Sequence, residues 1–194
     1  MDATFEPENY YWPWRWEDVF GRVAPVHVDI GCGDGGFLCQ AAAAMPEQNF
    51  FGIERLLGRV RKIARRAARE KLAYVRVLRL ENAYTVRYLM APESVDVFHL
   101  YHPDPFPKKK QQKRRLVRPE FAESIHKALK PNGLMLIRTD HAEYFEVMAE
   151  VFRNHGGFVE RETPEVFQRI QTDFEREYRD KGQAIYFAGF GKKG

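Results

Sequence analysis

Short apolar runs alternate with longer amphipathic segments along most of the chain, and this alternation predicts an α/β fold. No clear helical pattern separates the last two apolar runs, so we expect the strands they form to pair antiparallel. The runs interpreted as strands cover residues 26–30, 49–53, 75–80, 95–101, 134–137, 158–161 and 184–190. Helical spacing of apolar residues marks the segments 37–45, 56–71, 119–129 and 142–153.

The order of these elements predicts one domain over residues 1–194, with helices on both faces of a Rossmann-like sheet. We expect seven strands, mostly parallel, with an antiparallel last strand. An ordinary dinucleotide-binding domain would continue with another parallel crossover instead. Residues 1–20 form an N-terminal aromatic arm that holds all three tryptophans. The arm either packs against the domain or serves as a lid or a base-stacking platform.

Charge is concentrated rather than spread along the chain. The net charge is only +4, but two segments, 59–71 and 108–118, hold seven basic residues each. A solvated helix face explains the first cluster. The second cluster has hardly any apolar residue to anchor it, which favours a polyanionic partner such as RNA.

Several classes of protein are disfavoured by what the sequence lacks. No apolar run is long enough to span a bilayer, and residues 1–10 lack the apolar centre of an export signal. Cys32 and Cys39 indicate neither a disulfide framework nor a metal site. We therefore expect a cytoplasmic protein without a membrane or metal partner, either a monomer or a homodimer.

The turn after the first predicted strand matches G-x-G-x-x-G at Gly31, Gly33 and Gly36. This pattern indicates only that backbone approaches a ligand closely, and a structural turn without a ligand is the alternative. Asp29 lies two residues earlier, at the carboxyl end of the strand. A carboxylate there suits the ammonium and sulfonium of S-adenosyl-L-methionine and would repel a pyrophosphate.

Two further polar residues follow the next strands. Glu54 ends the second predicted strand, where an acid can accept both ribose hydroxyls. Asn82 follows the third strand, at a height suited to an adenine edge. Because an acid like Glu54 also occurs in NAD sites, a nicotinamide enzyme is the alternative, and Asp29 argues against it.

A rigid acidic corner precedes the second basic cluster. Asp104 lies between Pro103 and Pro105, which stiffen the backbone just past the fourth predicted strand. An acid beside a polyanion-binding loop is electrostatically costly unless it serves a cation or a donor-rich base. An ordinary loop turn is the alternative. His99 and His102 lie nearby without a completing zinc ligand, so we interpret them as core or pocket lining.

A series of motifs resembles the bacterial tRNA (guanine-N7)-methyltransferase family from about residue 16 to residue 190. The Pro-Asp-Pro corner with its basic continuation is the specific part, whereas the glycine turn is general to methyltransferases. The chain departs from the family pattern at His102, Phe106, Asp29 and Asn82, where the family usually has Phe, Trp, Glu and often Asp. The motifs, in order, are Asp29-Ile-Gly-Cys-Gly, Phe51-Gly-Ile-Glu54, Tyr101-His-Pro-Asp-Pro-Phe-Pro-Lys108-Lys109, Lys113-Arg-Arg-Leu-Val-Arg-Pro-Glu-Phe121, Leu129-Lys-Pro-Asn-Gly133, Arg138-Thr-Asp140 and Thr172-Asp-Phe-Glu175.

The resemblance implies a class I methyltransferase that transfers a methyl group from S-adenosyl-L-methionine to N7 of a tRNA guanine, guanine 46 of the variable loop. It implies that Asp104 lies at the reaction centre and also touches the cofactor, together with Asp29, Gly31, Gly33, Glu54 and Asn82. It assigns the substrate to Lys108, Asp140, Thr172, Asp173, Phe174 and Glu175, and RNA contacts to Lys110, Lys113, Arg114 and Arg115. The alternatives are methylation of another RNA site or of a protein, and an RNA-binding protein without catalysis.

The chemistry of guanine N7 agrees with these residue types. N7 has a free lone pair and needs no general base, and carboxylates nearby would stabilise the positive charge that develops on the base. A carboxylate can also accept from guanine N1–H and N2–H, and we expect Glu175 or Asp140 to do so, with Phe174 supporting the loop. The alternative for Glu175 is an ion pair with Arg176 or Arg179 on a surface turn.

Overall fold

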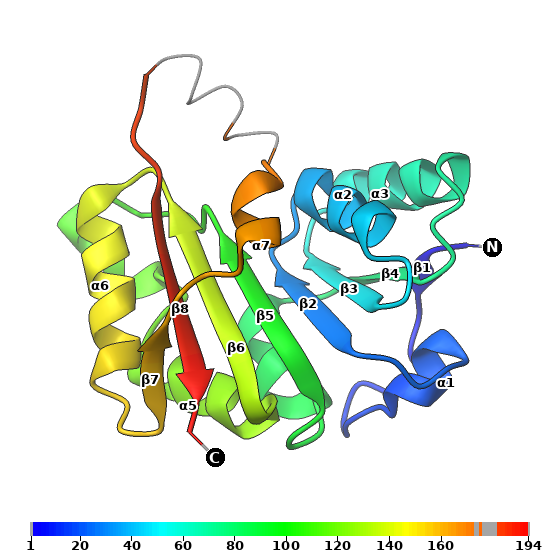
Figure 1. Cartoon of the computed structure of the whole chain (residues 1–194), viewed down its shortest axis with the longest axis horizontal. Helices are drawn as coiled ribbons and strands as arrows, with labels where there is room; N and C mark the ends of the chain where they lie inside the picture. Colours follow the sequence, from blue (N-terminus) through cyan, green and yellow to red (C-terminus); the bar gives the residue numbers. More distant parts are fainter. Residues whose placement is uncertain (1, 173–174, 176–181, 194) are drawn as a thin grey trace.

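A mixed sheet of eight strands, ordered β1–β4–β3–β2–β5–β6–β8–β7, forms the centre of the computed structural model (Figure 1). The structure describes residues 2–172, 175 and 182–193. Among these residues only β8 runs antiparallel to its neighbours, β6 and β7, which confirms the expected antiparallel last strand. The strands are β1 (Thr4–Phe5), β2 (Val26–Ile30), β3 (Asn49–Glu54), β4 (Val75–Arg79), β5 (Val95–Tyr101), β6 (Leu129–Thr139), β7 (Phe158–Arg161) and β8 (Tyr186–Lys192).

The eighth strand corrects the expectation of seven. β1 comes from the N-terminal arm, where Thr4 and Phe5 pair in parallel with β4 at one edge of the sheet. Two residues are too few to show a period, so hydropathy could not reveal this strand. The ring of Phe5 contacts those of Trp14 and Phe51 at centroid distances of 5.2 and 5.8 Å. This part of the arm therefore packs against the domain.

Helices cover both faces of the sheet, as expected. The short helix α7 between β7 and β8 was not predicted, because five residues are too few for a helical period to appear. The helical elements are α1 (Trp16–Phe20), α2 (Gly36–Ala44), α3 (Leu57–Arg69), α4 (Asn82–Tyr84), the π-helical turn η1 (Thr85–Leu89), the 3₁₀ turn η2 (Lys109–Arg114), α5 (Pro119–Ala128), α6 (Ala142–Arg153) and α7 (Glu165–Arg169).

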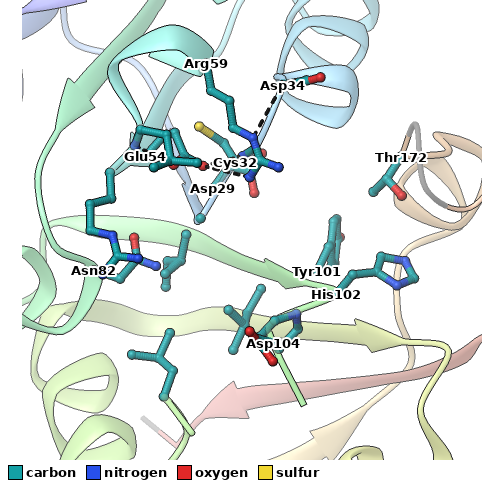
Figure 2. Close-up of a pocket in the computed structure, with 18 of the residues that line it drawn as sticks. Asp29, Cys32, Asp34, Glu54, Arg59, Asn82, Tyr101, His102, Asp104 and Thr172 are labelled. Atoms are coloured by element: carbon teal, nitrogen blue, oxygen red, sulfur yellow. Dashed lines mark hydrogen bonds and ion pairs between the residues drawn. The ribbon is translucent and has the colours of Figure 1, made fainter. Parts of the chain in front are cut away.

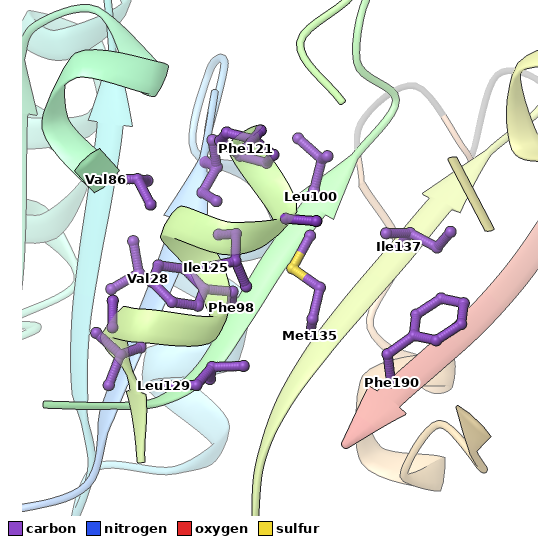
Figure 3. Close-up of a cluster of buried hydrophobic side chains, with 14 of the residues drawn as sticks. Val28, Val86, Phe98, Leu100, Phe121, Ile125, Leu129, Met135, Ile137 and Phe190 are labelled. Carbon is purple, nitrogen blue, oxygen red and sulfur yellow. The ribbon is translucent and has the colours of Figure 1, made fainter. Parts of the chain in front are cut away.

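Alternation along the strands builds a separate core on each face. Val28, Phe98 and Met135 belong to the core under α1, α5 and α6, part of which is drawn in Figure 3. Phe50, Val77 and Leu136 belong to the core under α2, α3 and α7. With both faces covered, the carboxyl ends of the parallel strands are left as the place where a ligand can enter. No helix among the described residues is long and apolar enough to cross a membrane.

Candidate active site

A cavity of about 670 Å³ opens at the carboxyl ends of β2, β3 and β5 (Figure 2). Its walls come from the glycine turn after β2, the end of β3, the start of α4 and the corner after β5. The cavity brings together eight of the site residues predicted from the sequence: Asp29, Gly31, Gly33, Glu54, Asn82, Asp104, Arg114 and Thr172.

The glycine turn has a backbone that other residues rarely adopt. Gly31 and Gly33 have φ angles of 71° and 56°, in the left-handed region where a side chain is strained. Close packing supports the turn from below, since a Cβ on Gly52 would lie 2.7 Å from Cys32 Sγ. Burial raises the pKa of the Cys32 thiol well above its usual value. Cys39 is also buried, and neither cysteine forms a disulfide.

Glu54 connects the glycine turn to the start of α3. Its Oε2 accepts a hydrogen bond from the Gly33 amide at 3.1 Å, and its Oε1 accepts from the Leu56 amide at 2.7 Å. Arg59 Nη1 lies 3.8 Å from the same Oε2, and its Nε lies 3.5 Å from Asp34 (Figure 2). The Glu54 carboxylate is therefore fixed in direction before any ligand binds.

Asp29 lies buried at the floor of the cavity, with 4% of its surface exposed. Burial raises its pKa to about 8, although the positive charge of Arg138 acts in the opposite direction and Glu54 adds to the rise. A cation bound beside Asp29 would restore the ionised form. The site is thus suited to the positively charged end of a ligand.

Asn82 offers a hydrogen-bond acceptor to the same cavity. Its Oδ1 is buried and has no hydrogen-bond partner among the described residues. Buried polar atoms are nearly always paired, so an acceptor left in a cavity wall indicates a ligand that donates. The Asn82 side chain also lies against Gly31, where an added Cβ would come within 3.3 Å of Nδ2.

The Pro-Asp-Pro corner is tightly constrained. His102 and Phe106, on either side of it, have left-handed φ angles of 50° and 40°, which cost energy in residues with side chains. The His102 amide donates to the Arg138 carbonyl at 2.7 Å, and Asp104 Oδ1 accepts from the Phe106 amide at 3.0 Å. Asp104 is exposed at the cavity rim, so its carboxylate is held in place yet accessible.

Asp140 is connected to the cavity by its contact with His102. The two side chains contact each other at 3.0 Å between His102 Nδ1 and Asp140 Oδ1. Burial lowers the pKa of His102, and the bond to Asp140 opposes this effect. His102 lines the cavity, whereas Asp140 lies beside it with 29% of its side chain exposed. His99 is fully buried and contacts His27 and Tyr101, so it belongs to the core.

Glu175 does not lie on a surface turn, the alternative considered from sequence. It is fully buried, and its Oε2 accepts from Arg138 Nη1 at 2.5 Å and from the Thr172 amide at 2.9 Å. The Glu175 amide donates in return to Thr172 Oγ1 at 3.1 Å. This reciprocal pair is a capping box, and the T-x-x-E spacing is its known sequence signature. Asp173 and Phe174 lie outside the described residues.

Sequence reasoning missed the role of Arg138. Its guanidinium also donates to the carbonyls of Phe167 and Ile170 and lies over the ring of Tyr101, 4.2 Å from the centroid. Arg138 on β6 thus fixes α7 and the residues after it beside the cavity. The signal available was the Arg-Thr-Asp motif, which the sequence analysis interprets through Asp140 alone.

The basic loop divides into exposed and buried members. Lys108, Lys110, Lys113 and Arg114 are exposed, and Arg114 also lines the cavity. Arg115 is buried instead: its guanidinium donates to the Pro105 carbonyl at 2.8 Å and to Glu143 at 3.0 Å. From the sequence, Arg115 was expected to contact RNA. In the structure its side chain is buried and connects the loop to the acidic corner and to α6.

The described residues include no group of three or more His, Cys, Asp or Glu side chains that could hold a metal ion.

Comparison with solved structures shows the methyltransferase fold. A crystal structure of the 16S rRNA methyltransferase KamB matches with a TM-score of 0.67 at 16% identity, over 92% of this chain and 93% of that one. A 30S ribosomal A1408 methyltransferase from an uncultured bacterium matches with a TM-score of 0.61 at 17% identity, over 91% of this chain and 92% of that one.

Sequence comparison is more specific. A family model described as a putative methyltransferase matches residues 23–188. A tRNA (guanine-N(7)-)-methyltransferase of Enterococcus faecalis is 33% identical over 90% of this chain and 84% of its own length. The protein of that name from Thermus thermophilus is 33% identical over 92% of this chain but only 58% of its own length. Because the match runs through both the glycine turn and the basic loop, the chain belongs to the tRNA (guanine-N(7)-)-methyltransferase family.

Proposed function

We propose that this protein transfers a methyl group from S-adenosyl-L-methionine to N7 of a guanine in tRNA, with guanine 46 of the variable loop as the expected position. One observation carries the proposal: a single cavity joins an acid-lined glycine turn to Asp104, beside an exposed basic loop. The names of the relatives support the choice of reaction and substrate.

The cavity residues fit the cofactor group by group. Asp29 offers a carboxylate to the ammonium, and Glu54 offers one to the ribose hydroxyls. The unpartnered Asn82 Oδ1 can accept from the exocyclic amine of adenine. S-adenosyl-L-methionine, when bound, supplies a methyl group on a positively charged sulfur. A dinucleotide fits less well, because the Asp29 carboxyl beside the glycine turn offers no positive charge to a pyrophosphate and repels it when ionised.

The catalytic task of the protein is to position the base and to stabilise charge. Guanine N7 attacks with its own lone pair, so no side chain has to remove a proton. The base becomes positively charged as the bond forms, and the Asp104 carboxylate at the rim stabilises that charge. The protein also lowers the barrier by holding N7 in line with the methyl group and the sulfur that it leaves.

The target base is read by a carboxylate beside the cavity. Asp140 is partly exposed and is held by His102, whereas Glu175 is buried against Arg138. The geometry therefore favours Asp140 over Glu175 as the acceptor for guanine N1–H and N2–H. Lys108, Lys110, Lys113 and Arg114 are free to contact the phosphates around that base.

The test is a methylation assay on unmodified tRNA with a labelled methyl donor, followed by mapping of the modified base. We expect the label on N7 of one guanine and no label when that guanine is replaced by adenine. Asp104→Ala should lower the single-turnover rate much more than it weakens cofactor binding. Label on another base or on protein, or a near-native rate for Asp104→Ala, would contradict the proposal.

A further inference from the structure

A second groove, of about 470 Å³, lies beside the active-site cavity, toward α5. Glu81, Arg114 and Leu116 line both spaces, so the groove adjoins the cavity. The proposed reaction uses the cavity and leaves this groove without a role. Its remaining walls are formed by Ala83, Arg87, Arg115, Arg118, Glu120, Phe121 and Ser124.

Arginines outnumber carboxylates in the groove, which is lined by four arginines (Arg87, Arg114, Arg115 and Arg118) and two glutamates (Glu81 and Glu120). Arg87, Arg114 and Arg118 are exposed, and none of them forms an ion pair with any residue that the structure describes. The Glu81 carboxylate keeps its charge, but its oxygens accept from the amides of Ala83 and Tyr84 at 3.0 and 2.7 Å and pair with none of these arginines. Three guanidinium groups around one concave surface suit a ligand with several negative charges.

Two exposed aromatic rings, Tyr84 and Tyr88, directly follow the groove residues Ala83 and Arg87, and the Arg87 guanidinium lies over the Tyr88 ring, 5.2 Å from its centroid. Tyr84 and Tyr88 lie on the α4–η1 segment with Arg87, their ring centroids are 5.0 Å apart, and 36% and 46% of their surfaces are exposed. The Tyr84 hydroxyl donates to the Tyr10 carbonyl at 2.6 Å, which brings the aromatic arm alongside. Arg87 and Tyr88 fall within the π-helical turn η1, a rare conformation that is frequent at functional sites.

We infer that this groove binds an unpaired segment of tRNA next to the target guanine. Arg87, Arg114 and Arg118 contact its phosphates, and the ring of Tyr88 stacks on one of its bases. The inference rests on the proposed function, because the groove adjoins the cavity that would hold the target base. It adds a binding surface on α4, η1 and α5 to the one formed by the basic loop.

The first test compares two exposed arginines of the groove with two exposed arginines on α3. Arg87→Gln and Arg118→Gln should each weaken tRNA binding several-fold and reduce the slope of log K against log salt by about 0.7–0.9. Arg61→Gln and Arg65→Gln, at exposed positions that line neither the cavity nor the groove, are the matched controls and should leave the slope unchanged. Affinity for S-adenosylhomocysteine, measured by calorimetry, shows that each variant is folded.

The second test addresses stacking at Tyr88. Tyr88→Phe keeps the ring and should retain tRNA affinity within about two-fold, whereas Tyr88→Leu should lose about five-fold or more. An equal affinity of the Leu and Phe variants overturns the stacking contact.

The outcomes separate this inference from the proposed function. If the wild-type protein methylates guanine N7 but the groove variants keep the wild-type salt slope, the groove is not an RNA site and the function stands. The groove is likewise excluded as an RNA site if the α3 variants reduce the slope as much as the groove variants do. If the wild-type protein does not bind tRNA, the proposed function fails together with the groove.

Discussion

The charge of Asp29 depends on what occupies the cavity beside it. With a pKa of about 8 without a ligand, the carboxyl is mostly protonated at pH 7. An ammonium group in contact with it favours the ionised form, so cofactor binding at pH 7 should release a proton. Calorimetry in buffers of different ionisation enthalpy measures this release. We expect close to one more proton for the wild-type protein than for Asp29→Asn, and equal values would rule out the contact.

The same residue should weaken the ligand-free fold as the pH rises. Its pKa is about 8 in the folded protein and 3.8 as the ordinary value, so the folded state holds the proton more tightly between these limits. Stability then falls with rising pH through this window, by at most about 1.4 kcal/mol per pH unit. Asp29→Asn removes the effect. Its gain in melting temperature over the wild-type protein should be larger at pH 8 than at pH 5, and a gain independent of pH would contradict the argument.

We expect Asp140, which His102 holds in place, to decide the choice of base. Inosine keeps N1–H and N7 but lacks the N2 amine, so it removes one donor from the contact that we assign to Asp140. The wild-type enzyme should methylate guanine about 10-fold faster than inosine at the same position, as expected for one hydrogen bond to a charged group. Asp140→Ala should bring the two rates close together, and His102→Phe, which frees Asp140, should narrow the gap partly. A full preference for guanine in Asp140→Ala would mean that other groups read the base.

At the scale of elements, one arginine, Arg138, fixes α7 and Glu175 beside the cavity. Arg138→Met would leave the fully buried Glu175 carboxylate without its guanidinium partner, which typically costs about 3–5 kcal/mol of unfolding free energy. Arg153→Met, which breaks the exposed pairs with Glu146 and Glu160, is the control and should cost under about 1 kcal/mol. Urea unfolding compares them. Similar losses of unfolding free energy in both variants would show that the buried Arg138–Glu175 pair contributes no more to stability than the exposed pairs of Arg153.

The positions of the long strands along the chain could be predicted because apolar runs and their spacing are local properties, and the absence of a clear helical pattern before the last strand predicted its antiparallel direction. The expected β6 was too short, however. Lys130-Pro-Asn-Gly133 has the composition of a turn, yet in the structure Leu129 already pairs with Val95 and a register shift follows before Val97. Pairing with β5 overrode the local preference, which is a tertiary effect that no single segment encodes.

The candidate site could also be predicted only in part. Residues at the carboxyl ends of strands, such as Asp29 and Glu54, could be placed together because parallel strands share that edge. Arg115 and Glu175 could not, since a charged residue in a polar segment is expected on the surface. Both are buried by partners far away in sequence, Glu143 and Arg138.

At the scale of the whole molecule, the N-terminal arm is part of the fold. Phe5 adds β1 to the sheet edge and contacts Trp14 and Phe51. Phe5→Ala should lower the unfolding free energy by about 2 kcal/mol, less than for a fully buried phenylalanine because Phe5 is partly exposed. Trp12→Ala, at a ring that is 62% exposed, should change it little. Denaturant unfolding of the two variants checks this, and an unaffected Phe5→Ala would mean that the arm is only loosely attached.

The close packing beneath the glycine turn has a practical consequence for labelling. Both cysteines of the chain are buried, and the Cys32 thiol resists ionisation, so maleimide reagents should react with neither in the folded protein. A single cysteine introduced at an exposed position of the basic loop, such as Lys113→Cys, would then take up a dye selectively without removal of the native thiols. Energy transfer from that dye to a fluorophore on tRNA could follow the approach of the loop to its substrate in real time.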